Sequence, residues 1–300
     1  MTDVTTLTLP PLRGSLSYHV SLAPYSWFRV GGPADLFFAP EDENDLSVFL
    51  SALPSDVSVL VLGLGSNLLV RDGGFRGVAI KLGKGFQTIT TDEQHRVVAG
   101  AGAADVKVAR IAAEAGIAGL SFLRGIPGTI GGALRMNGGA YGGETKDVFV
   151  SARGVDRSGR VHQFDREAMG FTYRHCAVAD DIIFTEAVFQ GRFGDPAAIL
   201  TEMNAITEAR SATQPVNTRT GGSTFRNPHG YKAWELVDQA GFRGVKKGGA
   251  EVSPLHTNFL IAHEGAKASD IEALGEEIRS RVFEQSGIRL EWEIKRVGEP

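Results

Sequence analysis

The sequence predicts a mixed α+β protein. Three observations support this fold class: short apolar runs bounded by glycine or polar turns, segments with apolar residues at helical spacing, and a second series of strands and helices after residue 194. At 300 residues the chain can bury one large core or two ordinary ones without disulfide bonds. We place a domain boundary where the second series begins, which gives domains at 1–193 and 194–300.

The first half of the chain is predicted to contain two buried strands, one helix and a long glycine-rich stretch. The strands are expected at 57–62 and 78–82, and the helix at 103–115, ending at Gly116. The helix should bury Val108, Ile111, Ala112 and Ala115 and expose Asp105, Lys107, Arg110 and Glu114. Residues 119–143 show no clear period, but their apolar residues favour an ordered, functional loop over disorder.

Further strands are predicted at 148–156, 160–164, 182–193, 250–253, 258–262 and 290–297. One helix begins at Asp195-Pro196, a second covers 231–240, and a third opens with the capping box Ser269 to Glu272. Arg210 lies on the buried face of the first of these helices, where a charge needs a partner or a ligand.

Composition favours a cytoplasmic protein that binds small molecules. No apolar run is long enough to span a membrane, and Met1–Leu12 lacks the basic and apolar regions of a secretory signal. The net charge of −4 argues against a nucleic-acid binder. Cys176 is the single cysteine, expected as a packing residue, and no histidine has metal-ligand spacing, so we expect no catalytic metal.

Glycine is unusually abundant, with 38 residues clustered in short loops. The first informative loop is Gly63-Leu64-Gly65-Ser66-Asn67-Leu68, which follows a strand but matches neither the Rossmann nor the P-loop spacing. Its backbone N–H groups, with the Ser66 hydroxyl and the Asn67 amide, could cradle a diphosphate. A plain glycine-rich turn is the alternative.

The second informative loop is Ile126-Pro127-Gly128-Thr129-Ile130-Gly131-Gly132-Ala133. It combines a stiff proline with closely spaced glycines, which can lay bare backbone against a flat ring or a phosphate; a structural turn is again the alternative. The two loops and the helix between them resemble FAD-binding domains of the vanillyl-alcohol-oxidase (PCMH) type, in which both segments embrace the FAD diphosphate. No histidine or cysteine stands in a context that suggests covalent attachment, so non-covalent FAD is expected.

Six ordered motifs extend this resemblance over about residues 20–298. They are Phe28 to Ala34, Gly65 to Val70, Ile126 to Ala133 with its continuation Asn137 to Gly142, Tyr173-Arg174, Gly222 to Pro228, and Leu290-Glu291-Trp292-Glu293. In this set the chain resembles the UDP-N-acetylenolpyruvoylglucosamine reductase (UDP-N-acetylmuramate dehydrogenase) family. Ser223 follows Arg174 by 49 positions, which is similar to the short form of the family that lacks a loop with a substrate-binding tyrosine.

The resemblance implies an NADPH- and FAD-dependent reduction of an enolpyruvyl nucleotide sugar in peptidoglycan precursor synthesis, and hence a role in cell-wall biogenesis, cell shape and division. It implies an FAD-binding domain of two subdomains at 1–193 and a substrate-binding domain at 194–300, whose terminal strand returns to the active site. A monomer is expected.

The resemblance also assigns site residues. Arg174 matches the arginine that binds the substrate carboxylate, Ser223 the proton donor, and Glu293 the third catalytic residue; spacing alone cannot choose between Glu291 and Glu293, which would share one face of a strand. Many relatives carry Ser where this chain has Cys176. Asn227 and Arg210 are candidate substrate contacts, with Arg219 as a weaker one.

Without the resemblance, each of these residues has an ordinary reading as a surface arginine, a turn serine or an edge glutamate. Two other functions remain open from the sequence. One is a flavin-dependent alcohol or sugar oxidase with the same FAD domain, which would turn over with oxygen and without NADPH. The other is a non-catalytic nucleotide-binding module, which leaves the three catalytic candidates unexplained.

Overall fold

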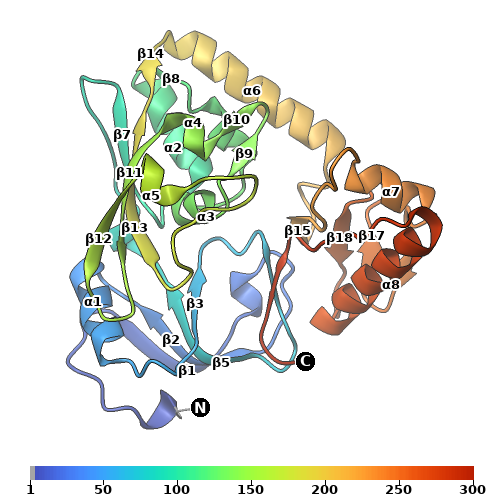
Figure 1. Cartoon of the computed structure of the whole chain (residues 1–300), viewed down its shortest axis with the longest axis horizontal. Coiled ribbons are helices and arrows are strands. Elements are labelled where there is room, and N and C mark those ends of the chain that lie inside the picture. The colour runs from blue at the N-terminus through green and yellow to red at the C-terminus, as the bar shows by residue number, and fades with distance from the viewer. Residues whose placement is uncertain (1–3) are drawn as a thin grey trace. The chain divides into compact units, whose positions relative to one another are not determined.

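The computed structural model describes residues 4–300, which divide into two compact units (Figure 1). Unit 1 consists of the residues up to Tyr18, Leu36–Leu64 and Gly77–Ala209. Unit 2 consists of His19–Asp35, Gly65–Arg76 and Arg210–Pro300. Residues 1–3 lie outside the described residues, so the predictions for the start of the first domain and for Met1–Leu12 are covered only from residue 4. The domain boundary at 193/194 stays a prediction.

Both helices and strands occur along the chain, as the α+β class predicts. In unit 1 a five-stranded antiparallel sheet has the order β12-β11-β13-β7-β6. Its strands are β6 (Ile89–Thr91), β7 (Arg96–Gly100), β11 (Phe149–Val155), β12 (Val161–Asp165) and β13 (Ile183–Gln190). The predicted strands at 148–156 and 160–164 are confirmed, and the one at 182–193 is divided into β13 and the short β14 (Arg192–Phe193), which pairs with β8 (Ile117–Ala118).

A four-stranded sheet has the order β1-β2-β5-β3 and lies mostly in unit 1. Its strands are β1 (Ser15–Ser21), β2 (Pro33–Ala39), β3 (Val59–Leu62) and β5 (Phe75–Lys81). The predicted strands at 57–62 and 78–82 are therefore confirmed. β3 runs parallel to β5, with Leu62 opposite Lys81, so both strands end where the first glycine loop begins.

The helices of unit 1 confirm two predictions and correct two. They are α1 (Glu43–Ala52), α2 (Asp105–Glu114), α3 (Ile130–Arg135), α4 (Thr145–Val148), α5 (Arg166–Met169) and most of α6 (Pro196–Thr213), with 3-10 turns at Val4–Thr6, Lys84–Phe86 and Ser121–Gly125. α2 and α6 stand where they were predicted, and the Asp195 carboxylate accepts hydrogen bonds from the N–H groups at the start of α6.

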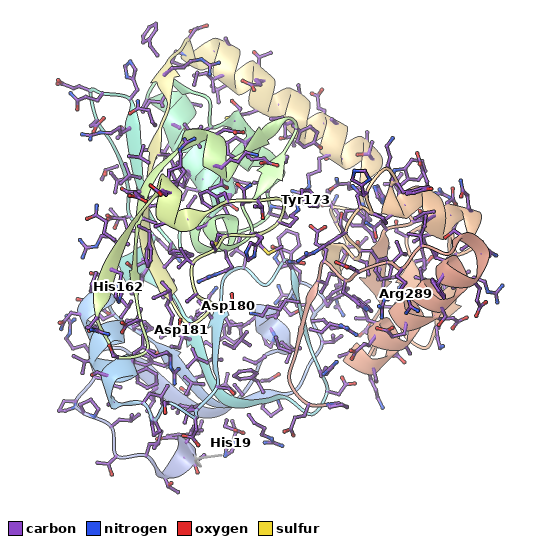
Figure 2. All side chains as sticks on the ribbon, viewed as in Figure 1. His19, His162, Tyr173, Asp180, Asp181 and Arg289 are labelled. Atoms are coloured by element: carbon purple, nitrogen blue, oxygen red, sulfur yellow. The ribbon has the colours of Figure 1, made fainter. Side chains whose placement is uncertain are left out.

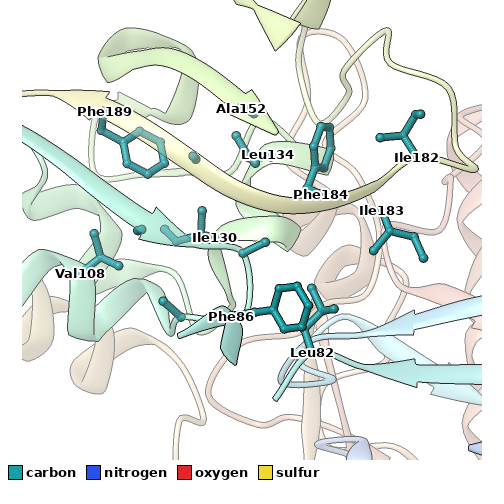
Figure 3. Close-up of a cluster of buried hydrophobic side chains, with 14 of the residues drawn as sticks. Leu82, Phe86, Val108, Ile130, Leu134, Ala152, Ile182, Ile183, Phe184 and Phe189 are labelled. Carbon is teal, nitrogen blue, oxygen red and sulfur yellow. The ribbon is translucent and has the colours of Figure 1, made fainter. Parts of the chain in front are cut away.

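The face of α2 was predicted wrongly at both ends, because Asp105 is fully buried and Ala115 is exposed. The glycine-rich stretch 119–143 was expected as a loop but contains α3 and the short strands β9 (Gly139–Ala140) and β10 (Gly143–Glu144). Two glycines weaken helix propensity, yet α3 forms because Ile130, Ala133 and Leu134 bury one face. Figure 3 shows Ile130 and Leu134 in the buried cluster with Phe184 and Phe189.

Unit 2 contains a four-stranded antiparallel sheet of order β15-β18-β17-β16, with α8 packed on it and α7 packed against α8 (Figure 1). The elements are β15 (Thr220–Ser223), β16 (Lys246–Lys247), β17 (Ala250–Val252), β18 (Phe259–Ala262), α7 (Ala233–Gln239) and α8 (Ala268–Ser286). β4 (Leu68–Val70) pairs in parallel with β19 (Lys295–Val297), and a 3-10 turn covers Ala23–Tyr25. None of the helices between residues 4 and 300 is both long and apolar enough to cross a membrane.

The start of α8 corrects the predicted capping box. The helix begins at Ala268, so Ser269 lies inside its first turn instead of capping it. The carboxylate of Asp72, which is distant in sequence, accepts hydrogen bonds from the N–H groups of Ala268 (2.9 Å) and Ser269 (3.0 Å). Burial works to raise the pKa of Asp72, but these hydrogen bonds outweigh it and the pKa is lowered.

We expect Asp72→Ala to lower the free energy of unfolding by about 1 kcal/mol, because it leaves two N–H groups of α8 without an acceptor. Asp72→Asn keeps one acceptor oxygen and should lose less. Urea unfolding followed by circular dichroism measures both variants, with Glu264→Gln, at an exposed carboxylate, as the control. Equal stability of Asp72→Ala and the wild type would contradict the capping role.

Candidate active site

The start of the first predicted cofactor loop, at Gly63, lies against the second loop within unit 1, whereas Gly65–Leu68 of the first loop belong to unit 2. A Cβ atom added to Gly63 would lie 2.8 Å from Thr129 Oγ1, so glycine is required for this close approach. Lys81, at the end of β5, donates a hydrogen bond from Nζ to the carbonyl oxygen of Gly63. The first loop is therefore held between the end of a strand and the second loop.

The backbone donors of the second loop are only partly available. The N–H of Ile130 donates to Ala103 O (3.0 Å), and that of Gly131 donates to Ala101 O (2.8 Å). These two N–H groups are therefore already paired and are not available to a diphosphate. Between residues 4 and 300, the N–H groups of Gly128, Thr129 and Gly132 have no hydrogen-bond acceptor. These three amides are the available donors of the loop.

A buried carboxyl group lies beneath the second loop. Asp105 is fully buried at the start of α2, and a Cβ atom at Gly128 would lie 2.8 Å from its Oδ2. Neither side-chain oxygen has a hydrogen-bond partner in the described chain, although the Asp105 N–H donates to Gly128 O. Burial raises the pKa of Asp105 well above its ordinary value, so the group remains a neutral acid as pH rises through the range where exposed aspartates ionise.

This raised pKa predicts a stability that falls with increasing pH. Above about pH 4 the unfolded chain releases the Asp105 proton while the folded chain retains it, so rising pH favours the unfolded state until the folded pKa is passed. Asp105→Asn removes this contribution, and its melting temperature should therefore gain on that of the wild type as pH increases from about 4 to 7. Asp180→Asn, at an exposed position labelled in Figure 2, is the control. A constant difference between Asp105→Asn and the wild type at all pH values would contradict a raised pKa.

Unit 2 brings three distant segments of the predicted site together. The Asn67 side chain donates from Nδ2 to the carbonyl oxygen of Glu293 (3.1 Å), and the N–H of Glu293 donates to Thr224 O (2.8 Å). Ser223 immediately precedes Thr224, so the predicted proton donor, the predicted carboxylate and Asn67 of the first loop belong to adjacent segments. Ser66 also lies close, since a Cβ atom at Gly222 would be 3.8 Å from its carbonyl oxygen.

Two glycines shape the backbone before Ser223. Gly221 packs against the ring of Phe28, which leaves no room for a side chain. Gly222 has a φ of 76°, a conformation that other residues adopt only with strain. The two glycines therefore let the backbone pass close to Phe28 and turn immediately before Ser223.

The chain end carrying Glu293 was predicted as one strand but is regular only over β19. Before it, Trp292 donates from Nε1 to Glu276 Oε1 (2.8 Å) on α8, and the Arg296 guanidinium lies 4.5 Å from the Trp292 ring centre. Glu291 is exposed whereas Glu293 is partly buried. The structure thus distinguishes the two glutamates, which their spacing alone could not.

Arg174 occupies a tight turn in unit 1 between α5 and β13, next to Tyr173, which Figure 2 labels. Its φ is 55°, an unusual conformation for a residue other than glycine and one often associated with functional sites. The guanidinium donates to Gly139 O at 3.5 Å and lies over the Tyr173 ring. The buried Asn137 side chain donates to Thr172 O and to Glu144 Oε2, both at 3.1 Å, which ties this turn to the glycine-rich stretch.

The two predicted substrate contacts have local structural partners. Asn227 Oδ1 accepts a hydrogen bond from the Ala233 N–H at the start of α7 (2.9 Å), and Arg210 Nε donates to Gln214 Oε1 (3.2 Å). Cys176 is buried in the core of unit 1, consistent with a packing role.

Comparison with known proteins identifies the family. Residues 34–165 match the family described as FAD binding domain, and residues 214–297 match the C-terminal domain of UDP-N-acetylenolpyruvoylglucosamine reductase. The UDP-N-acetylenolpyruvoylglucosamine reductase of Azorhizobium caulinodans is 61% identical over 97% of this chain and 94% of its own length. The chain belongs to the UDP-N-acetylenolpyruvoylglucosamine reductase family.

Solved structures agree with this family and with the predicted fold. The UDP-N-acetylenolpyruvylglucosamine reductase of Thermus caldophilus aligns with a TM-score of 0.81 and 32% identity, covering 96% of this chain and all of that one. The 6-hydroxy-D-nicotine oxidase of Arthrobacter nicotinovorans aligns with a TM-score of 0.51 and 16% identity, covering 95% of this chain and 62% of that one, and shares the fold alone. The predicted PCMH-type FAD domain with a reductase C-terminal domain is confirmed. Membership of the reductase family favours reductase activity over the two alternatives that the sequence left open, the oxidase and the non-catalytic module.

FAD is the cofactor of this reductase family, and Gly63 with the second glycine loop fits it. The bare backbone of Gly63 allows close approach, Gly128, Thr129 and Gly132 have N–H groups without acceptors in the described residues, and Lys81 contacts the carbonyl oxygen of Gly63. Lys81, Asp105 and Asn137 were not predicted as site residues. Only Asn137 had a sequence signal, because it opens the Asn137 to Gly142 motif.

A hollow of about 390 Å³ lies on unit 1, beside the start of α1. Its lining includes Glu43, Phe86, Gly100, Arg153 and Thr185. None of the predicted catalytic, cofactor-binding or substrate-binding residues lines it, so we base the site on the contacts of the loops and not on this hollow.

Proposed function

We propose that Arg174, Ser223 and Glu293 are the catalytic residues with which this chain reduces UDP-N-acetylglucosamine enolpyruvate to UDP-N-acetylmuramate. The family carries out this step in peptidoglycan precursor synthesis. FAD, held by the glycine loops, would supply the redox chemistry that links NADPH to C3 of the enolpyruvyl group. The protein must stabilise the negative charge that develops at C2 and deliver a proton there.

Arg174 is assigned to the substrate carboxylate. A guanidinium remains charged at all physiological pH values and can hold a carboxylate through two hydrogen bonds. As C2 gains negative charge next to that carboxylate, the same guanidinium stabilises it. The strained turn at Arg174 supports this role, because such strain persists where the surrounding contacts hold a side chain in a required position.

Ser223 is assigned as the proton donor to C2. The observation that supports this assignment is the pair of backbone hydrogen bonds at Glu293, one from Asn67 and one to Thr224, which joins the segments of Ser223, Glu293 and Asn67 in unit 2. A serine hydroxyl is a poor acid in water, so its neighbours must make it competent.

Glu293 is assigned to orient the substrate and to balance the positive charge of Arg174. Its backbone is fixed on both sides, by Asn67 at the carbonyl oxygen and by Thr224 at the N–H. Asn227 is assigned to the substrate through its side-chain amide, and Arg210 through its guanidinium group.

Anaerobic half-reactions test this function. NADPH should reduce the bound flavin, and adding the enolpyruvyl nucleotide sugar should reoxidise it with formation of UDP-N-acetylmuramate. The flavin absorbance near 450 nm follows both steps. A flavin that stays reduced after the substrate is added would reject the proposed acceptor. We further propose that the protein acts as a monomer in the cytoplasm, which size-exclusion chromatography and cell fractionation can test.

A further inference from the structure

Among residues 4–300, the cation at the end of β5, Lys81, has no acidic partner. Lys81 is half-buried, and its Nζ donates to the carbonyl oxygen of Gly63. Within residues 4–300 it forms no ion pair with a carboxylate. Burial lowers the pKa of Lys81, which reflects the cost of removing the ammonium group from water. A partly buried ammonium group is normally compensated by an anion.

The surroundings of Lys81 are built to receive an anion. The Gly63 carbonyl that it contacts belongs to the first cofactor loop, which packs against Thr129 of the second. Gly128, Thr129 and Gly132 present N–H groups without acceptors in the described chain. The carboxyl group of Asp105 packs against Gly128 of this second loop, and burial raises its pKa well above the ordinary value, which favours its neutral form.

The second loop has too few free backbone N–H groups to bind a diphosphate by backbone contacts alone. Two of the second loop's amides, at Ile130 and Gly131, are already paired with the backbone of residues 101–103. Bare backbone therefore offers fewer donors to a diphosphate than the loop sequence suggests. An ammonium group has three N–H donors, so Lys81 can contact Gly63 O and still donate to phosphate oxygens.

We infer that Lys81 binds the FAD diphosphate, supplying the positive charge that the glycine loops lack. The lysine acts on cofactor binding and takes no part in the chemistry at the enolpyruvyl group. This inference rests on the proposed assignment of the two glycine loops to the diphosphate. Its failure can be separated from failure of that assignment by altering the loop and the lysine independently.

The test measures FAD affinity of the apoprotein by quenching of flavin fluorescence at several NaCl concentrations. Lys81→Met removes the charge while keeping most of the side-chain volume, and Lys81→Arg keeps the charge. Lys84→Met, at an exposed lysine three positions along the chain, is the matched control. Circular dichroism and melting of each apoprotein establish that the variants fold.

Loss of a charged hydrogen bond to phosphate should raise the Kd for FAD about 10- to 100-fold in Lys81→Met. The salt dependence of binding should flatten at the same time, because a screened charge pair has been removed. Lys81→Arg should retain most of the affinity, and Lys84→Met should match the wild type. A folded Lys81→Met protein with wild-type affinity would overturn the inference, as would a weaker affinity with unchanged salt dependence.

Gly132→Glu tests the loop separately. It places a negative charge at an exposed position beside the unpaired amides, where a Cβ atom has room. Weaker FAD binding in this variant combined with normal binding in Lys81→Met would keep the loop assignment and reject Lys81. Normal binding in both would reject the loop assignment as well.

Discussion

Ser223→Ala is expected to slow reoxidation of the reduced flavin by the enolpyruvyl substrate about 100- to 10,000-fold, the usual contribution of a positioned proton donor. Reduction of the flavin by NADPH needs no proton from Ser223 and should change by less than about 2-fold. The difference between the two half-reactions is the signature of the proposed role, because a general loss of structure would slow both.

Anaerobic stopped-flow measurements of each half-reaction provide this comparison. Thr220→Ala, on the same strand, is the control, since the Thr220 hydroxyl is buried and has no partner in the described chain. It should leave both half-reactions close to wild type. Equal slowing of the two half-reactions in Ser223→Ala would remove Ser223 from the proton-donor role.

Arg174→Met is expected to slow substrate-dependent reoxidation about 100- to 1,000-fold, as seen when a donor to developing negative charge is removed. It should also raise the concentration of substrate needed for half-maximal rate, because the carboxylate loses its cation in the ground state. Arg174→Lys restores the charge without the paired hydrogen bonds, so its rate should fall between those of Arg174→Met and the wild type.

The control for Arg174 is Arg160→Met, on an exposed turn of the same unit. The flavin absorbance spectrum and the FAD content should be unchanged in Arg174→Met, Arg174→Lys and Arg160→Met, since Arg174 is assigned to the substrate. A wild-type reoxidation rate in Arg174→Met would contradict its assignment to the carboxylate.

Much of the fold followed from local sequence patterns. The strands at 57–62 and 148–156 and the helix beginning at Asp195-Pro196 carry apolar periods and a cap that need no tertiary information. The α3 helix could not be predicted in this way, because Gly131 and Gly132 are poor helix formers and the helix depends on its buried apolar face. The start of α8 was missed because its capping carboxylate, Asp72, lies almost 200 residues earlier in the chain.

The candidate site shows the same division. Residues 63–68 and 126–133 could be singled out from glycine spacing, and family resemblance supplied Arg174, Ser223 and Glu293. Lys81 could not be found, because a lysine at the end of a strand is ordinary until its contact with Gly63 is known. Asp105 was assigned to the polar face of α2, and only packing under Gly128 shows that it is buried.

The central claim is that Arg174, Ser223 and Glu293 meet at the enolpyruvyl group of the substrate. A crystal structure of the oxidised enzyme with FAD and the enolpyruvyl nucleotide sugar tests it most directly, because oxidised flavin cannot turn the substrate over. We predict the Arg174 guanidinium on the substrate carboxylate, Glu293 beside the same group, and Ser223 Oγ within about 3.2 Å of C2. A substrate bound with Ser223 directed away from C2, or with its carboxylate held by a residue other than Arg174, would contradict the account.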